Sequence, residues 1–282
     1  MKISGLLRFM QERQRIYERR ARGDAPPWTR DPVLRIYKFT NVYREHDRMT
    51  RWIDDNIRQP YDDHPNLWLM LAIARVGFRS DALEDLIRTR RAWPASSVFS
   101  VDAFDAWLAT RRKAREKTFL AAYQVNPQYT MLHAVRSLWA MRRALAPELR
   151  AASLQRATEA LSKARGVGRF IAYEVACDLR HTQWLANATD VRTWASSGPG
   201  SSLGMSIVVG APPTRHWPDA DFSARCIELL RWIEPRWGPP TMLRPRLELR
   251  DIEHSLCEMF KWHRATVGNG RLRQRFYPTS DE

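Results

Sequence analysis

Apolar residues recur every three to four positions along most of the chain, which is the period of an amphipathic α-helix. Residues 206–209 form a strand-like run, which is too short to indicate a sheet. An extended linker is expected at 26–28 and a loop at 186–204. The pattern therefore predicts an all-α fold, with two lobes. Its helices are expected over 1–22, 33–57, 64–76, 80–91, 101–113, 115–123, 128–146, 219–234 and 248–263.

A short glycine turn, Gly166-Val167-Gly168, separates two further helical patterns. Glycine adopts positive φ and carries no Cβ, so the N–H groups that open the second helix can point at an anion. Arg165 and Arg169 lie on either side of the turn. These features predict a helix-hairpin-helix that grips a DNA phosphate, and the alternative is an ordinary turn between helices.

The charge of the chain supports a nucleic-acid partner. The 282 residues include 46 Lys and Arg against 31 Asp and Glu, for a net charge of +15. Most of the basic residues are arginines, which bind phosphate through two parallel hydrogen bonds. Binding to a membrane surface is the alternative, but the basic residues are spread along the chain instead of gathering on one amphipathic helix. DNA affinity should then fall steeply with salt.

Size and cysteine content narrow the class of protein. No apolar run approaches the roughly 20 residues of a membrane span, and the first residues do not resemble a signal peptide. Cys177, Cys226 and Cys257 are dispersed and odd in number, so neither a disulfide framework nor a four-cysteine metal site is predicted. We expect a monomeric cytoplasmic protein with no membrane partner.

Residues 39–51 are the first stretch that could carry chemistry. If they form a helix, Asn41, Arg44 and Arg48 fall on one face. Two arginines at a four-residue spacing repel each other unless an anion or Asp47 compensates. The stretch is thus either a phosphate-facing site or a salt-bridged surface.

Asp190 opens the second stretch, which ends in a glycine-rich loop. Its carboxylate could stabilise developing positive charge or take a proton at a base pocket. The alternative is a helix N-cap, since aspartate is among the best capping residues. Gly198 and Gly200 could bring the backbone close to a phosphate. No Gly-x-x-x-x-Gly-Lys-Ser/Thr motif occurs in the sequence.

The third stretch lies on the last predicted helix. Glu253, Glu258 and Lys261 stand beside its apolar stripe, where they form either a solvated face or an acid/base cluster. Among the twelve tryptophans, Trp194 lies next to the glycine-rich loop. Most tryptophans belong to a core, but one near a site could stack on an extruded base.

Taken together, these motifs resemble known families. Gly166-Val167-Gly168 followed by Asp190 resembles the helix-hairpin-helix DNA glycosylases. The segments around Trp28, Asn41, Gly198 and Glu253 resemble the phage α-glutamyl/putrescinyl thymine pyrophosphorylases, over nearly the whole chain. The helical domain of 5-hydroxymethyluridine DNA kinases shares the Phe39-Thr-Asn-Val-Tyr-Arg44 signature.

The resemblance implies thymine hypermodification on double-stranded DNA, in which pyrophosphate leaves the 5-methylene of a modified uracil and an amino acid or polyamine replaces it. The target base would be flipped into a pocket. No cofactor is required, although Mg²⁺ could accompany the pyrophosphate. The catalytic residues would be Asp190, Glu253, Glu258 and Lys261. The substrate-binding residues would be Asn41, Tyr43, Arg44, Asp47, Arg48 and Trp194. The DNA-binding residues would be Arg165, Gly166, Val167, Gly168, Arg169, Gly198 and Gly200.

Three other functions stay open: a protein related to the 5-hydroxymethyluridine DNA kinases, a monofunctional DNA glycosylase and a non-catalytic DNA-binding subunit. The expected organisation is one glycosylase-like helical unit over 1–282. Its segments are an N-terminal helix and linker (1–30), a helical lobe (31–150), the hairpin and site loop (151–204), C-terminal helices (205–263) and a basic tail (264–282).

Overall fold

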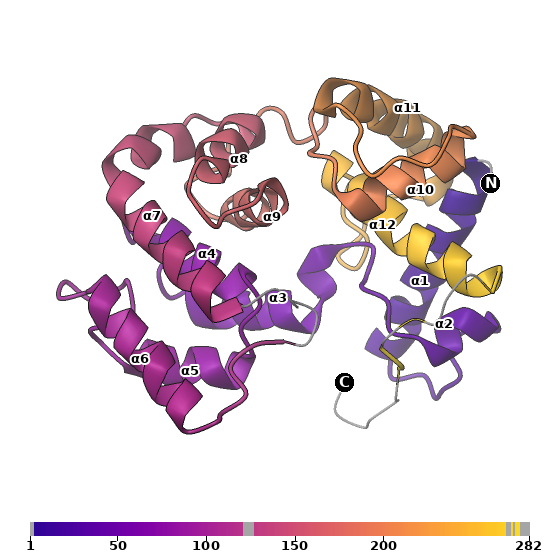
Figure 1. The fold of residues 1–282 in the computed structure, drawn as a ribbon. Coiled ribbons are helices and arrows are strands. Elements are labelled where there is room, and N and C mark those ends of the chain that lie inside the picture. Colours follow the sequence, from indigo (N-terminus) through magenta and orange to yellow (C-terminus); the bar gives the residue numbers. More distant parts are fainter. Residues whose placement is uncertain (1–2, 121–126, 269–271, 273, 277–282) are drawn as a thin grey trace. The chain divides into compact units, whose positions relative to one another are not determined.

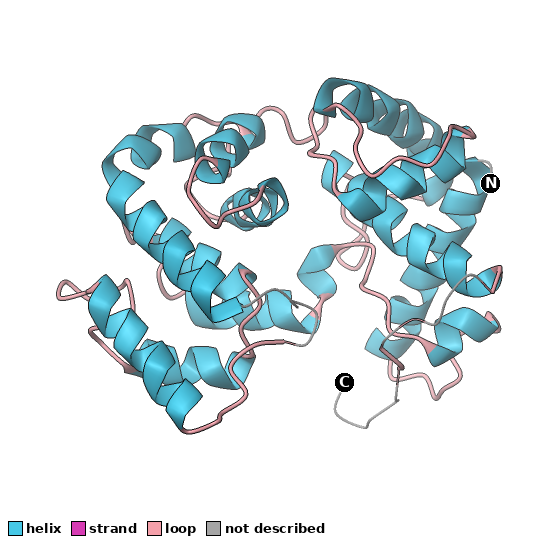
Figure 2. Cartoon of the chain, in the orientation of Figure 1, coloured by secondary structure: helices cyan, strands magenta, loops and turns pink. Residues whose placement is uncertain are grey.

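The computed structural model describes residues 3–120, 127–268, 272 and 274–276. Helices are the main regular secondary structure of the described part, and loops connect them (Figure 2). β-Pairing among the described residues is limited to isolated bridges. The predicted all-α class is therefore confirmed. The α-helices are α1 (Ile3–Ala21), α2 (Pro32–Ile36), α3 (Arg48–Ile53), α4 (Leu67–Arg75), α5 (Ser80–Arg88), α6 (Val101–Lys113), α7 (Pro127–Leu149), α8 (Leu154–Ser162), α9 (Arg169–Leu179), α10 (Pro199–Val209), α11 (Asp219–Trp237) and α12 (Leu249–Thr266). A 3₁₀ turn, η1 (Arg44–His46), precedes α3, and a π-helical turn, η2 (Asp54–Arg58), follows it.

The chain divides into two compact units (Figure 1). Unit 1 combines residues 1–47 with residues 191–282, and unit 2 is the continuous stretch 48–190. These limits differ from the expected segment limits, because the first helices pack against the last ones instead of against their neighbours in sequence.

Unit 1 is assembled around α12, which packs against α10, α1, α11 and α2. Ten of the first eleven residues of α12 are buried. α10 approaches it closely, because Gly200 lies against the side chain of Cys257 and Gly204 against the backbone of Leu256. A Cβ at either glycine would overlap those atoms, so the spacing of the two helices depends on these glycines.

Unit 2 is assembled around α4, whose nine residues are all buried. A helix that is apolar on every side is typical of the centre of a core. α9 packs against α4, α8 against α9, and α7 against α8. A buried ion pair also joins the first two of these, since Arg75 of α4 donates to both carboxylate oxygens of Asp178 of α9. The hairpin helices α8 and α9 are thus fixed to the core.

Two predicted helices and one predicted loop are wrong over part of their length. Residues 37–43 are not helical, because side chains take up backbone groups that a helix would pair internally. Residues 114–120 also lie outside any helix, and 121–123 fall outside the described residues. The strand-like run 206–209 belongs to α10, which begins with Pro199 at its first turn and ends at Gly210 with φ +74°. The predicted loop therefore ends at 198.

The basic tail begins later than expected, because α12 continues to Thr266. Residues 274–276 pair with residues 36–38 through backbone hydrogen bonds, in which Phe276 donates to Ile36 and Lys38 to Gln274. This part of the tail therefore docks on its own unit. No described helix is long and apolar enough to cross a membrane.

Candidate functional site

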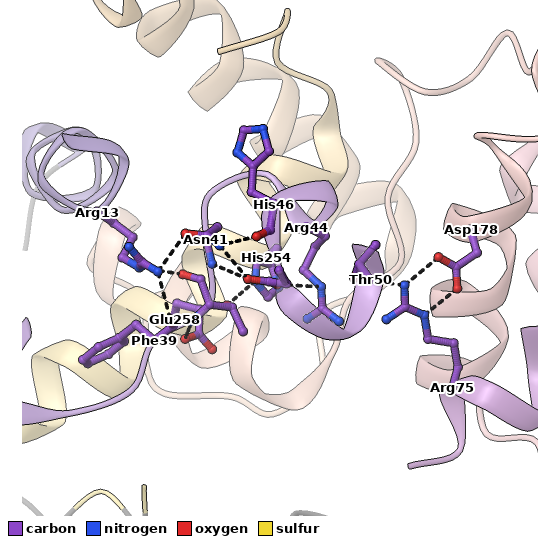
Figure 3. A network of polar contacts seen from close by, with 12 residues as sticks. Arg13, Phe39, Asn41, Arg44, His46, Thr50, Arg75, Asp178, His254 and Glu258 are labelled. Atoms are coloured by element: carbon purple, nitrogen blue, oxygen red, sulfur yellow. Dashed lines mark hydrogen bonds and ion pairs between the residues drawn. The ribbon is translucent and has the colours of Figure 1, made fainter. Parts of the chain in front are cut away.

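A buried arginine holds the segment 39–47, which carries most of the predicted substrate-binding residues. Arg13 of α1 donates to the carbonyls of Phe39 and Thr40, at 3.2 and 2.9 Å, and to Oδ1 of Asn41 at 2.8 Å (Figure 3). Hydrogen bonds from a charged donor each contribute roughly 1.5–3 kcal/mol. Burial lowers the pKa of Arg13 to about 10, against the opposing effect of Asp47, so the guanidinium stays charged at neutral pH.

Asn41 and Asp47 close the segment into a loop. Oδ1 of Asp47 accepts from the backbone N–H of Asn41 at 2.8 Å and from its Nδ2 at 3.0 Å. Nδ2 also donates to the carbonyl of His46. Burial raises the pKa of Asp47, while Arg44, 3.4 Å away, and Arg13 lower it. The amide of Asn41 is thus engaged on both sides within the loop.

α12 supplies the opposite wall of this loop. Glu258 accepts from the backbone N–H of Thr40 at 3.0 Å and from Nζ of Lys261 at 2.9 Å. His254 bonds to the Thr40 hydroxyl. Burial alone would raise the pKa of Glu258, but Lys261 and His254 outweigh it and the pKa is lowered. Glu258 is therefore an ionised counterion of Lys261 at neutral pH.

Five predicted residues contact the Cys257 thiol or act on it electrostatically. Burial and the charges of Glu258 and Glu253 raise the pKa of this thiol to about 12, against the opposing effects of Lys261 and Arg44. Gly200, in the first turn of α10, lies against the same sulfur. Two cations and two carboxylates are thus close enough to this thiol to shift its pKa. We call this group, Arg44, Gly200, Glu253, Glu258 and Lys261, the charge cluster.

The two cations of the charge cluster are its more accessible members. The side chain of Lys261 is 36 % exposed and that of Arg44 is 18 % exposed. Glu253 and Glu258 are both buried. Cations near a surface can bind an anionic group. Carboxylates buried behind them can accept a proton.

Tyr43 and Trp194, both predicted to bind substrate, are buried side chains. The Tyr43 hydroxyl donates to the carbonyl of Pro245 at 2.7 Å and accepts from Nε1 of Trp237 at 2.8 Å. Burial raises the pKa of Tyr43 well above its usual value, so the phenol stays protonated. Tyr43 therefore ties the segment 39–47 to the loop that follows α11.

Unit 2 contains the other predicted residues except Gly198, beginning with the hairpin. Gly166 has φ +85°, and a Cβ there would lie 2.8 Å from the carbonyl oxygen of Thr130. Gly168 has φ −72°, and a Cβ there would meet nothing within 4 Å. The fold therefore requires a glycine at 166 and leaves the space beside 168 open.

The hairpin surface is exposed and basic. Arg165 and Arg169 are exposed, whereas Val167 packs into the core. No side chain caps the first turn of α9. Phe170, in that turn, is 47 % exposed. An uncapped helix N-terminus between arginines suits a phosphate.

Asp190 binds the first turn of α8 in the structure. Its carboxylate accepts from the backbone N–H groups of Leu154 at 2.8 Å and Gln155 at 3.0 Å, and from the Ser153 hydroxyl at 2.7 Å. The expected N-cap role is wrong, because no helix follows Asp190 directly. The carboxylate instead binds the first turn of α8, whose own N-cap residue is Ser153. The predicted helical face of Asn41, Arg44 and Arg48 does not form, because residues 37–43 are not helical and Arg44 begins a separate 3₁₀ turn. Arg48 is exposed at the start of α3.

Sequence reasoning did not identify Arg13, nor the buried pair Arg75–Asp178. Arg13 follows apolar residues at helical spacing in α1, and Arg75 ends a run of eight apolar residues. A charged residue in such a position signals a buried partner, because an unpaired charge is rarely buried.

Gly198 is the N-cap of α10. Among the described residues, no group of three or more His, Cys, Asp or Glu is arranged to hold a metal ion.

Comparisons with known proteins identify the family. Residues 2–271 match the family described as 5-hmdU DNA kinase, helical domain. A 5-hmdU DNA kinase of Bacillus phage SP10 is 29 % identical over 284 aligned positions, which cover 89 % of this chain and 43 % of that protein. This chain therefore spans less than half the length of that relative, and no solved structure matches it. The resemblance to the pyrophosphorylases stays a prediction. The chain belongs to the family of the helical domain of 5-hmdU DNA kinases.

Proposed function

We propose that this protein acts on a 5-substituted uracil within DNA and replaces pyrophosphate on the 5-methylene with an amine. The observation that carries the proposal is the charge cluster. Such a reaction needs cations for the leaving group and a carboxylate for the proton of the incoming amine. Family membership supports DNA as the substrate, because the similar phage protein is a 5-hmdU DNA kinase.

The roles follow from exposure and pairing. Arg44 and Lys261 receive the pyrophosphate as the carbon–oxygen bond breaks and the oxygen takes the electron pair. Glu253 accepts the proton that the amine loses as its nitrogen bonds to the 5-methylene carbon. Glu258 holds Lys261 in place, since its own pKa is lowered by that pairing. The hairpin of unit 2 contributes DNA phosphate contacts.

Nucleoside mass spectrometry tests the proposal. Purified protein is incubated, with and without Mg²⁺, with DNA containing 5-(pyrophosphoryloxymethyl)deoxyuridine and a mixture of amino acids and polyamines. We expect a nucleoside with the mass of the 5-methylene plus one amine. Glu253→Gln should slow its formation by about 10²–10⁴-fold, whereas Glu159→Gln, at an exposed position of α8, should not. An unchanged nucleoside pool would overturn the proposal.

Asp190→Asn belongs in the same assay, because Asp190 stays an alternative proton acceptor. Its carboxylate already binds the first turn of α8, so we expect the variant to alter stability more than transfer. Lost transfer with unchanged thermal unfolding would assign the proton transfer to Asp190 and not to Glu253.

A second proposed function is phosphorylation of 5-hydroxymethyluracil in DNA, which the printed name of the family favours. Incubation with DNA containing 5-hydroxymethyldeoxyuridine and ATP tests it directly. A nucleoside heavier by one phosphate, and only when ATP is present, would favour the kinase. Abasic sites would favour the glycosylase, and intact DNA binding without any product would favour the binding subunit.

A further inference from the structure

An apolar side chain projects from the loop between α11 and α12. Thr241 and Arg244 are paired by two backbone hydrogen bonds, of 2.8 and 3.1 Å, so residues 241–244 of this loop form a β-turn. Met242 and Leu243 form its tip. Met242 is 97 % exposed, which makes it the most exposed of the large apolar side chains in the described residues. The fold itself thus gives Met242 no packing role.

Hydrogen bonds from other elements hold the β-turn at 241–244 in place beneath this exposed tip. Arg244 donates to Glu18 at 2.7 Å and to the carbonyl of Trp237 at 2.8 Å. Gln14 donates to the carbonyl of Leu243 at 2.7 Å. Two more hydrogen bonds hold the loop just beyond the β-turn. Tyr43 donates to the carbonyl of Pro245, and Arg192 donates to that of Leu247.

The segment that carries the tip is basic. Residues 231–250 contain five arginines and two acidic residues. Arg231, Arg236 and Arg246 are exposed, whereas the other two arginines are buried or partly buried. Arg246, close behind the tip, has a largely exposed side chain that pairs with Glu234. An apolar tip on a basic and ordered support matches a duplex, whose stacked bases are apolar and whose backbone is anionic.

We propose that Met242 is a wedge that enters a base step of DNA and occupies space in the stack beside the extruded target base. Methionine is among the apolar side chains that proteins insert between base pairs, which unstacks the step. A loop that is already held in place adds little backbone-ordering cost when its tip binds. The inference rests on the proposed function, because it takes DNA as the partner of unit 1.

Base unstacking can be measured by fluorescence. The probe is a duplex with 2-aminopurine next to one 5-(pyrophosphoryloxymethyl)deoxyuridine, and the protein is the full chain. Wild-type protein should raise the 2-aminopurine signal, and Met242→Ala should reduce that rise by about fivefold. Met242→Leu should retain it. Val209→Ala, an exposed apolar position at the end of α10, serves as the matched control.

The outcomes separate the wedge from the function. A rise in 2-aminopurine fluorescence with Met242→Ala equal to that of wild type would overturn the wedge. The nucleoside assay would still test the proposed function independently. A wild-type protein that binds no DNA at low salt would overturn the DNA-directed function as well. If Met242→Ala instead abolished self-association in sedimentation, with the fluorescence rise intact, the tip would be a protein interface and the wedge would be rejected.

Discussion

The segment 39–47 of unit 1 and the hairpin of unit 2 attract attention in the sequence for similar reasons, yet they use their residues in opposite ways. In unit 1, Asn41, Tyr43 and Asp47 are engaged within the protein. In the hairpin, Arg165, Gly168 and Arg169 face outward. The polar groups of segment 39–47 thus hold its backbone, whereas the hairpin residues are exposed to solvent.

The largest expected effect tests whether the segment 39–47 is held from within. Arg13→Met keeps the aliphatic stem but removes every donor to Phe39, Thr40 and Asn41. We expect a loss of about 3–5 kcal/mol in the free energy of unfolding, measured by urea denaturation. Arg15→Met, an exposed position of the same helix, should cost less than about 0.5 kcal/mol. Equal effects of the two substitutions would remove the contrast between the regions.

A smaller effect is expected from pH. Burial raises the pKa of Asp251, whose carboxylate accepts from the N–H of Glu248, to about 7. The folded state therefore holds this proton more tightly than the unfolded state, and ionisation weakens the fold as pH rises from about 4 to 7.

Asp251→Asn keeps an acceptor and removes the titration. The free energy of unfolding of the variant should therefore rise relative to that of wild type through this window, with a difference of about 2–4 kcal/mol at pH 8. The check is a series of urea titrations between pH 4 and pH 8, with the exposed Asp221→Asn as control. A stability difference that stays constant with pH would contradict the raised pKa.

The hairpin glycines provide the finest test, since only two positions separate them. Gly166→Ala forces positive φ and a contact with the Thr130 carbonyl, so about 2 kcal/mol of stability should be lost. Gly168→Ser should leave stability unchanged or raise it by a few tenths of a kcal/mol, because serine caps helices well. The same serine fills the open space beside α9 and should weaken DNA binding, as fluorescence anisotropy would show. Undiminished binding by Gly168→Ser would exclude this turn as a phosphate grip.

Periodicity alone predicted the all-α class and placed the helix over 101–113 where α6 forms. It failed over 37–43, because Arg13 and Glu258 lie 26 and 218 residues from the backbone groups that they bind. It also failed over 199–204, where the sequence indicates a loop and the first part of α10 forms. Local patterns carry no information about such distant partners.

The charge cluster was partly predictable. Glu253, Glu258 and Lys261 were chosen because ionisable groups stood beside an apolar stripe, and α12 places all three near Cys257. The approach of α10 to that helix was not foreseen, since it depends on Gly200 and Gly204 meeting residues more than 50 positions away. The same limit applies to Arg13 and its loop.

Unit 1 combines two segments that are far apart in the sequence, so the first segment is synthesised well before the second one that it packs against. Thr40 emerges from the ribosome 218 residues before Glu258, the side chain that binds its N–H. At translation rates of roughly 5–20 residues per second, that interval lasts about 10–45 seconds. Residues 48–190 have been made by then and can fold first, so the nascent chain passes through a stage in which Arg13 and its loop await α12.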